Sequence, residues 1–234
     1  MKNILLVHGW DYDNYYGRTT KEAWNNREKF ISELSKNYHV FPIDLPGFGN
    51  NPPPGAKMWT LDDFAIYIEE YIKDKKLAID YLLGYSFGGA VSIRWKTKFK
   101  HHAKLLLISP AIVRNFENSH SFLKTPEFLE PIRNSLRNFY LIHIIKNPEM
   151  KYGTKFHQNT YQSIVRLDLT KEVESIPKEE LAIIYGDVDN MVNPNKLQET
   201  IDEKYKERII LIKGGGHDIA NTHTEKLIEE IKKF

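Results

Sequence analysis

The 234-residue chain contains no cysteine, and that absence excludes several classes of protein. Without thiols the chain can form neither a disulfide framework nor a thiolate metal site, and no cysteine can serve as a nucleophile. No apolar run is long enough to cross a membrane. The first apolar run, Ile4 to Val7, is too short for the core of a signal peptide. These absences predict a cytoplasmic protein that has no membrane partner.

Neither sign of charge predominates, because 33 Lys and Arg residues oppose 31 Asp and Glu residues, leaving a formal net charge of +2. A charge balance as even as this argues against nucleic acid as a partner. Hydrophobic residues make up 41% of the chain, which is enough for a full core. The length is that of one domain that could carry an insertion.

Six short apolar runs alternate with amphipathic stretches along most of the chain. They predict strands near residues 4–7, 38–43, 79–83, 105–108, 181–185 and 209–212. A helix is predicted over residues 20–35, and Thr222 with Glu225 is predicted to form a capping box before the last helix. Asp44 is expected to bond the backbone of its own turn. The alternation predicts an α/β fold, with a mainly parallel six-stranded sheet and helices on both faces.

The alternation stops between residues 109 and 181, where helical spacings and scattered prolines replace it. Residues 112–167 are therefore predicted to form a helical lid, inserted into a core made of residues 1–111 and 168–234. His143 and His157 fall in this lid and are predicted to be packed or exposed rather than catalytic. Its basic residues could dock an acidic carrier protein, although a solvated helix face is the simpler interpretation: Arg114, Arg133, Arg137 and Lys146.

A serine flanked by glycines stands where an apolar run meets a helical pattern, in Gly84-Tyr85-Ser86-Phe87-Gly88-Gly89. At such a junction the serine forms a sharp turn and exposes its hydroxyl near the positive end of the helix. The simpler interpretation is a glycine-rich turn that caps a helix. Catalysis by Ser86 therefore depends on whether the chain supplies a base, an acid and oxyanion donors.

Three more polar motifs follow predicted strands. His8-Gly9-Trp10 follows the first strand, Gly186-Asp187-Val188-Asp189 the fifth, and Gly214-Gly215-Gly216-His217-Asp218 the sixth. Because the C-terminal ends of parallel strands share one edge of a sheet, these motifs should meet Ser86 there. The order serine, aspartate, histidine is that of the hydrolase nucleophile elbow.

This convergence predicts a catalytic triad of Ser86, His217 and Asp189. His217 would take the proton of the serine hydroxyl, and a buried carboxylate would hold the imidazole in the required tautomer. Asp189 is the preferred acid because it lies further beyond the strand end. Asp187 is the alternative candidate for the acid, and Asp218 is a weaker candidate.

Backbone and aromatic groups complete the predicted site. The N–H groups of Trp10 and Phe87 are the predicted oxyanion donors. Tyr85, Tyr15 and Tyr16 are candidate pocket residues, the last two from a long loop after the first strand. Aspartates in that loop lack the glutamate that a calcium loop requires, so no metal site is predicted.

The motifs together resemble the alpha/beta-hydrolase superfamily, on five segments in order: His8-Gly9-Trp10, Asp44-Leu45-Pro46-Gly47-Phe48-Gly49, Gly84-Tyr85-Ser86-Phe87-Gly88-Gly89, Gly186-Asp187-Val188-Asp189 and Gly216-His217-Asp218. The resemblance covers nearly all of the chain outside the lid. It implies a sheet that usually has eight strands, of which the first two would be missing here. The first two segments are also similar to small carboxylesterases of the pimeloyl-carrier-protein methyl-ester esterase type.

These residues and this resemblance predict a serine hydrolase that cleaves a small carboxylic ester through an acyl-Ser86 intermediate, without a cofactor. A lactonase or a carbon–carbon bond hydrolase of the meta-cleavage-product type would use the same triad, since substrate choice would lie in the lid and pocket. The alternative from another class is a non-catalytic ligand-binding protein on the same scaffold.

Overall fold

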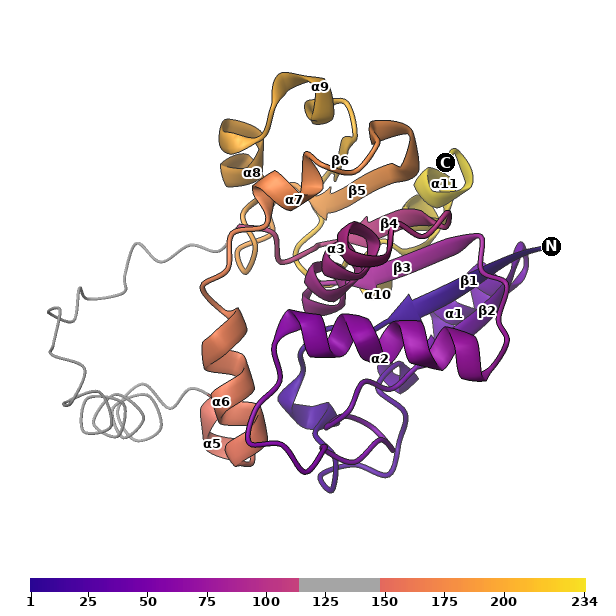
Figure 1. The fold of residues 1–234 in the computed structure, drawn as a ribbon. Helices are drawn as coiled ribbons and strands as arrows, with labels where there is room; N and C mark the ends of the chain where they lie inside the picture. Colours follow the sequence, from indigo (N-terminus) through magenta and orange to yellow (C-terminus); the bar gives the residue numbers. More distant parts are fainter. Residues whose placement is uncertain (114–147) are drawn as a thin grey trace, which may run out of the picture.

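One parallel sheet lies between layers of helices in the computed structural model, which describes residues 1–113 and 148–234 (Figure 1). The strands are β1 (Lys2–Val7), β2 (Tyr38–Ile43), β3 (Tyr81–Tyr85), β4 (Lys104–Ile108), β5 (Leu181–Gly186) and β6 (Ile209–Ile212). They lie in the order β2-β1-β3-β4-β5-β6, and each neighbouring pair is parallel. The predicted fold, a six-stranded α/β sheet, is confirmed, and the C-terminal ends of its strands share one edge.

The helices of the described residues connect these strands. They are α1 (Glu28–Ser35), α2 (Leu61–Asp74), α3 (Phe87–Phe99), α5 (Pro148–Tyr152), α6 (Lys155–Ile164), α7 (Thr170–Val173), α8 (Pro194–Thr200), α9 (Glu203–Lys206), α10 (Ile219–Thr222) and α11 (Thr224–Lys232). None of them is long and apolar enough to cross a bilayer.

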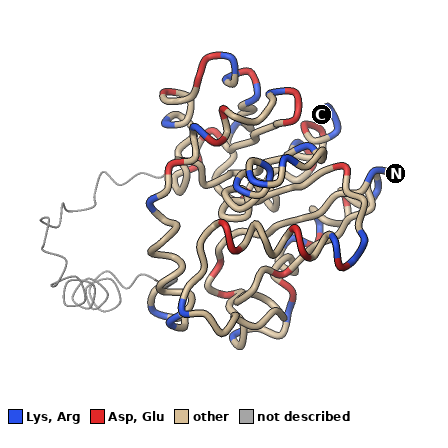
Figure 2. Tube along the Cα trace, viewed as in Figure 1, with Lys and Arg blue, Asp and Glu red and all other residues tan. Residues whose placement is uncertain are grey.

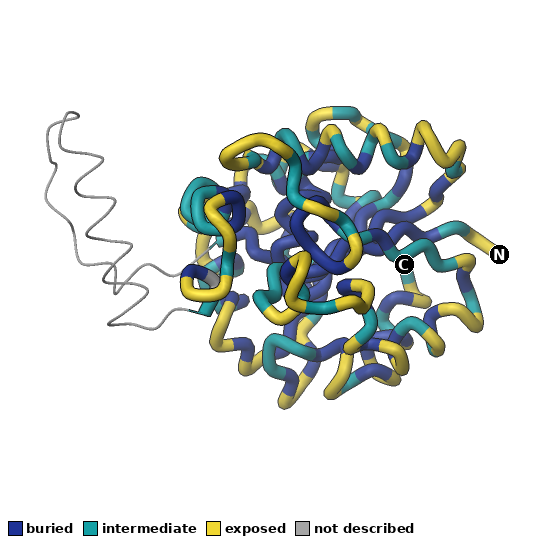
Figure 3. The backbone as a smooth tube through the Cα atoms, turned by 90° about the horizontal axis from the view of Figure 1, so that it is seen from below, coloured by how far each residue is buried: buried dark blue, intermediate teal, exposed yellow. Residues whose placement is uncertain are grey.

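Alternate residues of each strand pack against opposite layers. In β1, Leu5 and Val7 join the core that includes α2 and α3, whereas Ile4 and Leu6 join the core that includes α1 and α11. Because both faces are covered, the inner strands β3 and β5 are buried along their whole length, whereas the edge strand β2 exposes His39. Figure 3 shows the buried backbone in the middle of the molecule. Figure 2 shows charged residues of both signs spread over the surrounding helices and loops.

The helix predicted over residues 20–35 begins later than expected. A 3-10 turn spans Asn25–Arg27, and the α-helix begins only at Glu28. Ahead of it, the N–H of Ala23 donates to the Asp44 carboxylate at 2.8 Å, and the Ala23 carbonyl accepts from the Asn14 side chain at 3.1 Å. Backbone groups that are held by tertiary hydrogen bonds cannot join a helical ladder, so loop packing overrides helix propensity here.

The predicted capping box of Thr222 and Glu225 is wrong. Thr222 is the last residue of α10, and its hydroxyl donates back to the Asp218 carbonyl at 2.9 Å. The last helix begins at Thr224 without a side-chain cap from the residue before it. The Thr222 hydroxyl therefore bonds to the backbone of the short helix α10 instead of capping the last helix. The sequence pattern does not reveal this local bond.

Of the predicted lid, the structure describes residues 112–113 and 148–167, and α5 and α6 lie in the second of these ranges. His143 and the four basic lid residues fall outside the described residues. His157 in α6 is packed, as predicted. Its Nε2–H donates to the Gly47 carbonyl at 2.7 Å, and its ring stacks on Tyr15 with 3.9 Å between centroids.

Candidate active site

Ser86 lies in a strained turn between β3 and α3. Its φ of 52° and ψ of −113° fall outside the regions that residues with side chains favour, at a cost of about 1–3 kcal/mol. The turn is held by the Ser86 N–H, which donates to the Ile108 carbonyl at 2.9 Å. A Cβ atom on Gly88 would collide with the Val7 carbonyl, so only glycine lets α3 start this close to β1.

The Ser86 hydroxyl, the His217 ring and the Asp189 carboxylate form one hydrogen-bonded row. Ser86 Oγ lies 3.0 Å from His217 Nε2, and His217 Nδ1 lies 2.9 Å from Asp189 Oδ2. The three side chains follow β3, β6 and β5, and they meet because all these strands end at one edge of the sheet. A neutral imidazole in this position can accept the serine proton at Nε2 while Nδ1–H stays bound to the carboxylate.

Asp189 is held as a buried carboxylate. Its second oxygen, Oδ1, accepts from the N–H groups of Met191 at 2.9 Å and Val192 at 3.0 Å. Burial raises the pKa of Asp189, but the hydrogen bonds from His217 and from these two amides outweigh it, so the net pKa lies below the ordinary value. Asp187 points elsewhere, since its carboxylate is exposed and accepts from the Gly214 N–H at 2.7 Å.

The segments that carry the two predicted oxyanion amides lie beside Ser86. Phe87 is the first residue of α3, so no carbonyl of the helix lies where its N–H could donate to it. Gly9 lies against the elbow, because a Cβ atom there would stand 3.2 Å from Ser86 Cβ. The Gly9–Trp10 peptide is trans, so the Trp10 N–H points opposite to the Gly9 carbonyl.

His8 fixes the plane of that peptide. Its Nδ1–H donates to the Gly9 carbonyl at 2.7 Å, and its Nε2 accepts from the Leu45 N–H at 2.9 Å, so the ring is neutral. Burial lowers the pKa of His8 to about 4. In the sequence, His8 stands out only as part of the His8-Gly9-Trp10 motif. Its role depends on Leu45, thirty-seven residues away, which no local pattern reveals.

The three candidate pocket tyrosines take different positions. Tyr85 belongs to the core layer of α1 and α11, and its hydroxyl donates to the His217 carbonyl at 3.1 Å, so it supports the histidine loop. Tyr15 is buried and accepts from the Trp10 indole N–H at 2.7 Å, and Tyr16 is 45% exposed. Tyr85 and Phe87 lie in different core layers because alternate residues face opposite sides of the sheet.

A small apolar cavity lies beside Phe87. Its volume is about 10 Å³, enough for one water-sized group. Ala111, one of its walls, donates its N–H to the Ser86 carbonyl at 3.0 Å, which places the cavity next to the Ser86 backbone. The lining is entirely apolar and consists of Leu61, Phe87, Ala90, Ala111, Ile164, Leu167 and Leu169.

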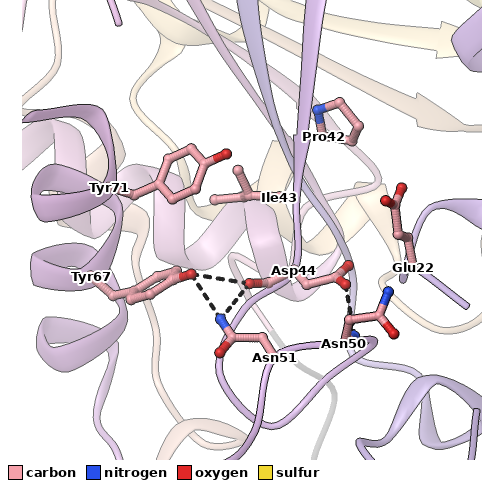
Figure 4. Close-up of a pocket in the computed structure, with 8 residues that line it drawn as sticks. All are labelled: Glu22, Pro42, Ile43, Asp44, Asn50, Asn51, Tyr67 and Tyr71. Atoms are coloured by element: carbon pink, nitrogen blue, oxygen red, sulfur yellow. Dashed lines mark hydrogen bonds between the residues drawn. The ribbon is translucent and has the colours of Figure 1, made fainter. Parts of the chain in front are cut away.

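A larger open cavity of about 300 Å³ lies at the C-terminal end of β2 and contains none of the Ser86, His217 and Asp189 side chains (Figure 4). The Asp44 carboxylate in its wall accepts from the Asn50 N–H at 2.9 Å, as expected for a turn residue. The Asp44 carbonyl accepts from the Asn51 amide at 2.8 Å. These bonds hold the turn that presents the Leu45 N–H to His8.

Comparison with known proteins agrees with this architecture. A model of the alpha/beta hydrolase family matches residues 4–230. The chain is 23% identical over 260 residues to a pimeloyl-[acyl-carrier protein] methyl ester esterase of Aeromonas hydrophila, covering 99% of this chain and 94% of the relative. It is 29% identical over 114 residues to a 2-hydroxy-6-oxo-2,4-heptadienoate hydrolase of Pseudomonas putida, covering 49% of this chain but only 39% of that protein. A match to a probable lysophospholipase of Arabidopsis thaliana covers 24% of its length.

Solved structures share the fold at low identity. A meta-cleavage product hydrolase from Pseudomonas fluorescens aligns with a TM-score of 0.68 at 20% identity, covering 100% of this chain and 90% of the other. An esterase from Exiguobacterium antarcticum aligns with a TM-score of 0.62 at 18% identity, covering 99% of this chain and 92% of the other. The family match spans nearly the whole sequence, and the chain therefore belongs to the alpha/beta hydrolase family.

Proposed function

We propose that this protein is a serine hydrolase that cleaves a small carboxylic ester through an acyl-Ser86 intermediate. One observation carries the proposal: the continuous row from Ser86 Oγ to His217 Nε2 at 3.0 Å and from His217 Nδ1 to Asp189 at 2.9 Å. A hydroxyl becomes an effective nucleophile when a neutral base is within hydrogen-bond reach and a third group orients that base.

The reaction follows from this row. Ser86 Oγ attacks the ester carbonyl carbon while its proton passes to His217 Nε2. The N–H groups of Trp10 and Phe87 bind the oxyanion, a contribution typically worth about 3 kcal/mol for each donor. His217 then gives its proton to the departing alcohol. Water attacks the acyl group by the same route, which releases the acid and restores the serine hydroxyl.

Two observations favour a small ester. The cavity beside Phe87 is apolar, and its volume of about 10 Å³ holds no more than one water-sized group, so it offers no room for a long acyl chain. The methyl ester esterase of Aeromonas hydrophila matches along 94% of its own length, whereas the heptadienoate hydrolase matches along 39%. The full-length match therefore supports ester chemistry more strongly than carbon–carbon bond cleavage.

Turnover of p-nitrophenyl acetate, butyrate and octanoate tests the proposal. Wild type should cleave the two short esters faster than the octanoate, and Ser86→Ala should lose at least about 10³-fold in kcat. The exposed Ser175→Ala is the matched control and should keep wild-type turnover. Unchanged turnover in Ser86→Ala would refute the acyl-serine mechanism.

The same panel separates the alternatives. Addition of lactones and of aryl vinylogous diketones distinguishes a lactonase or a carbon–carbon bond hydrolase, which would use the same three side chains. A wild-type protein that neither cleaves any of them nor reacts with a fluorophosphonate at Ser86 would be a ligand-binding member of the family. If the basic lid residues dock an acidic carrier protein, the turnover of carrier-bound esters should fall steeply as the salt concentration rises. The turnover of free esters should not.

A further inference from the structure

The backbone carbonyl of His217 is bound by two side-chain hydroxyls. Tyr85 Oη donates to it at 3.1 Å and Ser109 Oγ donates to it at 3.0 Å. Tyr85 precedes Ser86 at the end of β3, and Ser109 follows the end of β4, so two neighbouring strands hold the loop that carries the His217 ring. Both residues are buried, with exposed fractions of 4% and 0%.

Ser109 adopts an uncommon backbone conformation to make this contact. Its φ of 43° lies in the left-handed region that residues other than glycine rarely enter. The N–H of Ser109 donates to the Ile184 carbonyl of β5 at 2.8 Å, which keeps the backbone in this conformation. Strain of this kind gathers at functional sites, where the surrounding structure maintains it.

A buried arginine holds the other side of the loop. Arg27 Nη2 lies 3.1 Å from Asp218 Oδ1, and its guanidinium carbon lies 4.3 Å from the centroid of the Tyr85 ring. The Tyr85 hydroxyl is also 3.3 Å from the same Asp218 oxygen. A planar guanidinium can stack on a ring and donate to a carboxylate at the same time, which a lysine ammonium cannot do.

We propose that Arg27, Tyr85 and Ser109 are positioning residues for His217, acting on its backbone and on Asp218 rather than on a substrate. This inference rests on the proposed function of His217 as the base. Glycines precede His217 in the loop, so the loop itself has little preference for the one placement that faces both Ser86 and Asp189. A misplacement of about 1 Å in such a group can cost about 100-fold in rate.

Tyr85→Phe tests the inference against a matched control, Tyr205→Phe. The Tyr205 hydroxyl is likewise buried and lies within hydrogen-bond distance of two carbonyls, those of Glu174 at 2.6 Å and Ile176 at 2.8 Å. Active sites are counted with a fluorophosphonate, so that kcat refers to folded, reactive protein. Tyr85→Phe should lower kcat for p-nitrophenyl acetate about 5- to 10-fold with KM within about twofold. Tyr205→Phe should lower Tm similarly and keep the wild-type kcat.

Further variants separate positioning from general stability. Tyr85→Phe combined with Ser109→Ala leaves the His217 carbonyl without either hydroxyl, and kcat should fall by more than the product of the single effects. Arg27→Met should lower kcat several-fold, and Arg27→Lys should restore part of it by keeping the charge opposite Asp218.

The outcomes separate this inference from the proposed function. If wild type labels at Ser86 and turns over while the kcat of Tyr85→Phe per active site equals that of Tyr205→Phe, the positioning role is wrong and the hydrolase proposal stands. If wild type neither labels nor turns over, both fail together.

Discussion

His8 should make the protein less stable in mild acid. In the folded chain burial holds the pKa of His8 at about 4, against an ordinary value of 6.5. Between these two values the unfolded chain therefore binds one proton more than the folded chain. The unfolding free energy contributed by the neutral ring is fully present above about pH 6.5 and is lost progressively as the pH falls toward 4.

The size of the effect follows from the same two values. Each pH unit over which one extra proton is bound changes the unfolding free energy by about 1.4 kcal/mol. Lowering the pKa from 6.5 to about 4 therefore makes His8 responsible for about 3 kcal/mol of stability that disappears between neutral pH and pH 4. Total stabilities of about 5–15 kcal/mol make this a large share.

Urea unfolding at several pH values between 7 and 4 measures this effect. His8→Gln keeps an acceptor for the Leu45 N–H but cannot take up the proton, so its unfolding free energy should fall less steeply with pH than that of wild type. The buried His157, whose pKa burial also lowers, contributes to both proteins and cancels in the difference. His39→Gln, at an exposed position, is the control and should retain the wild-type slope. If the unfolding free energies of wild type and His8→Gln fell in parallel with pH, the conclusion that the folded chain keeps the His8 ring neutral would be wrong.

Two other substitutions probe the site and its scaffold. Asp189→Asn should lower ester kcat by about 10³- to 10⁴-fold, because an amide no longer fixes the tautomer of the base. Asp187→Asn can still accept from the Gly214 N–H and should stay within about threefold of wild type; equal losses in the two variants would count against Asp189. Gly88→Ala should lower Tm by more than about 10 °C or prevent folding, since the new Cβ meets the Val7 carbonyl. A Cβ atom on Gly55 would meet no atom within 4 Å, so the control Gly55→Ala should leave Tm unchanged. A Gly88→Ala protein with the wild-type Tm would contradict the close packing of α3 on β1.

The convergence of Ser86, Asp189 and His217 could be anticipated because it follows from topology. Apolar runs separated by amphipathic stretches predict parallel strands, and parallel strands bring their C-terminal loops to one edge whatever the details of packing. Only the ordering of the motifs and the strand ends is needed for that inference. The sequence distinguishes Asp187 from Asp189 less well, because the two side chains leave one turn in directions that depend on its tertiary contacts with Gly214 and His217.

Other contacts depend on segments that are distant in sequence. The N-terminal end of α1 is shortened by Asp44, and the His8 ring is held by Leu45. Neither contact has a local signal, because periodicity reports which face of a segment is buried but not which group it meets.

The sequence alone determined the α/β sheet, the strand ends at which the candidate site lies and the serine that stands between glycines. Tertiary structure alone decided that the Tyr85 hydroxyl holds the His217 carbonyl, and that Arg27 lies over the Tyr85 ring. The physical reason is that backbone pattern specifies elements and their order, whereas a hydrogen bond needs two atoms brought within about 3 Å, which only the packing of the whole chain achieves.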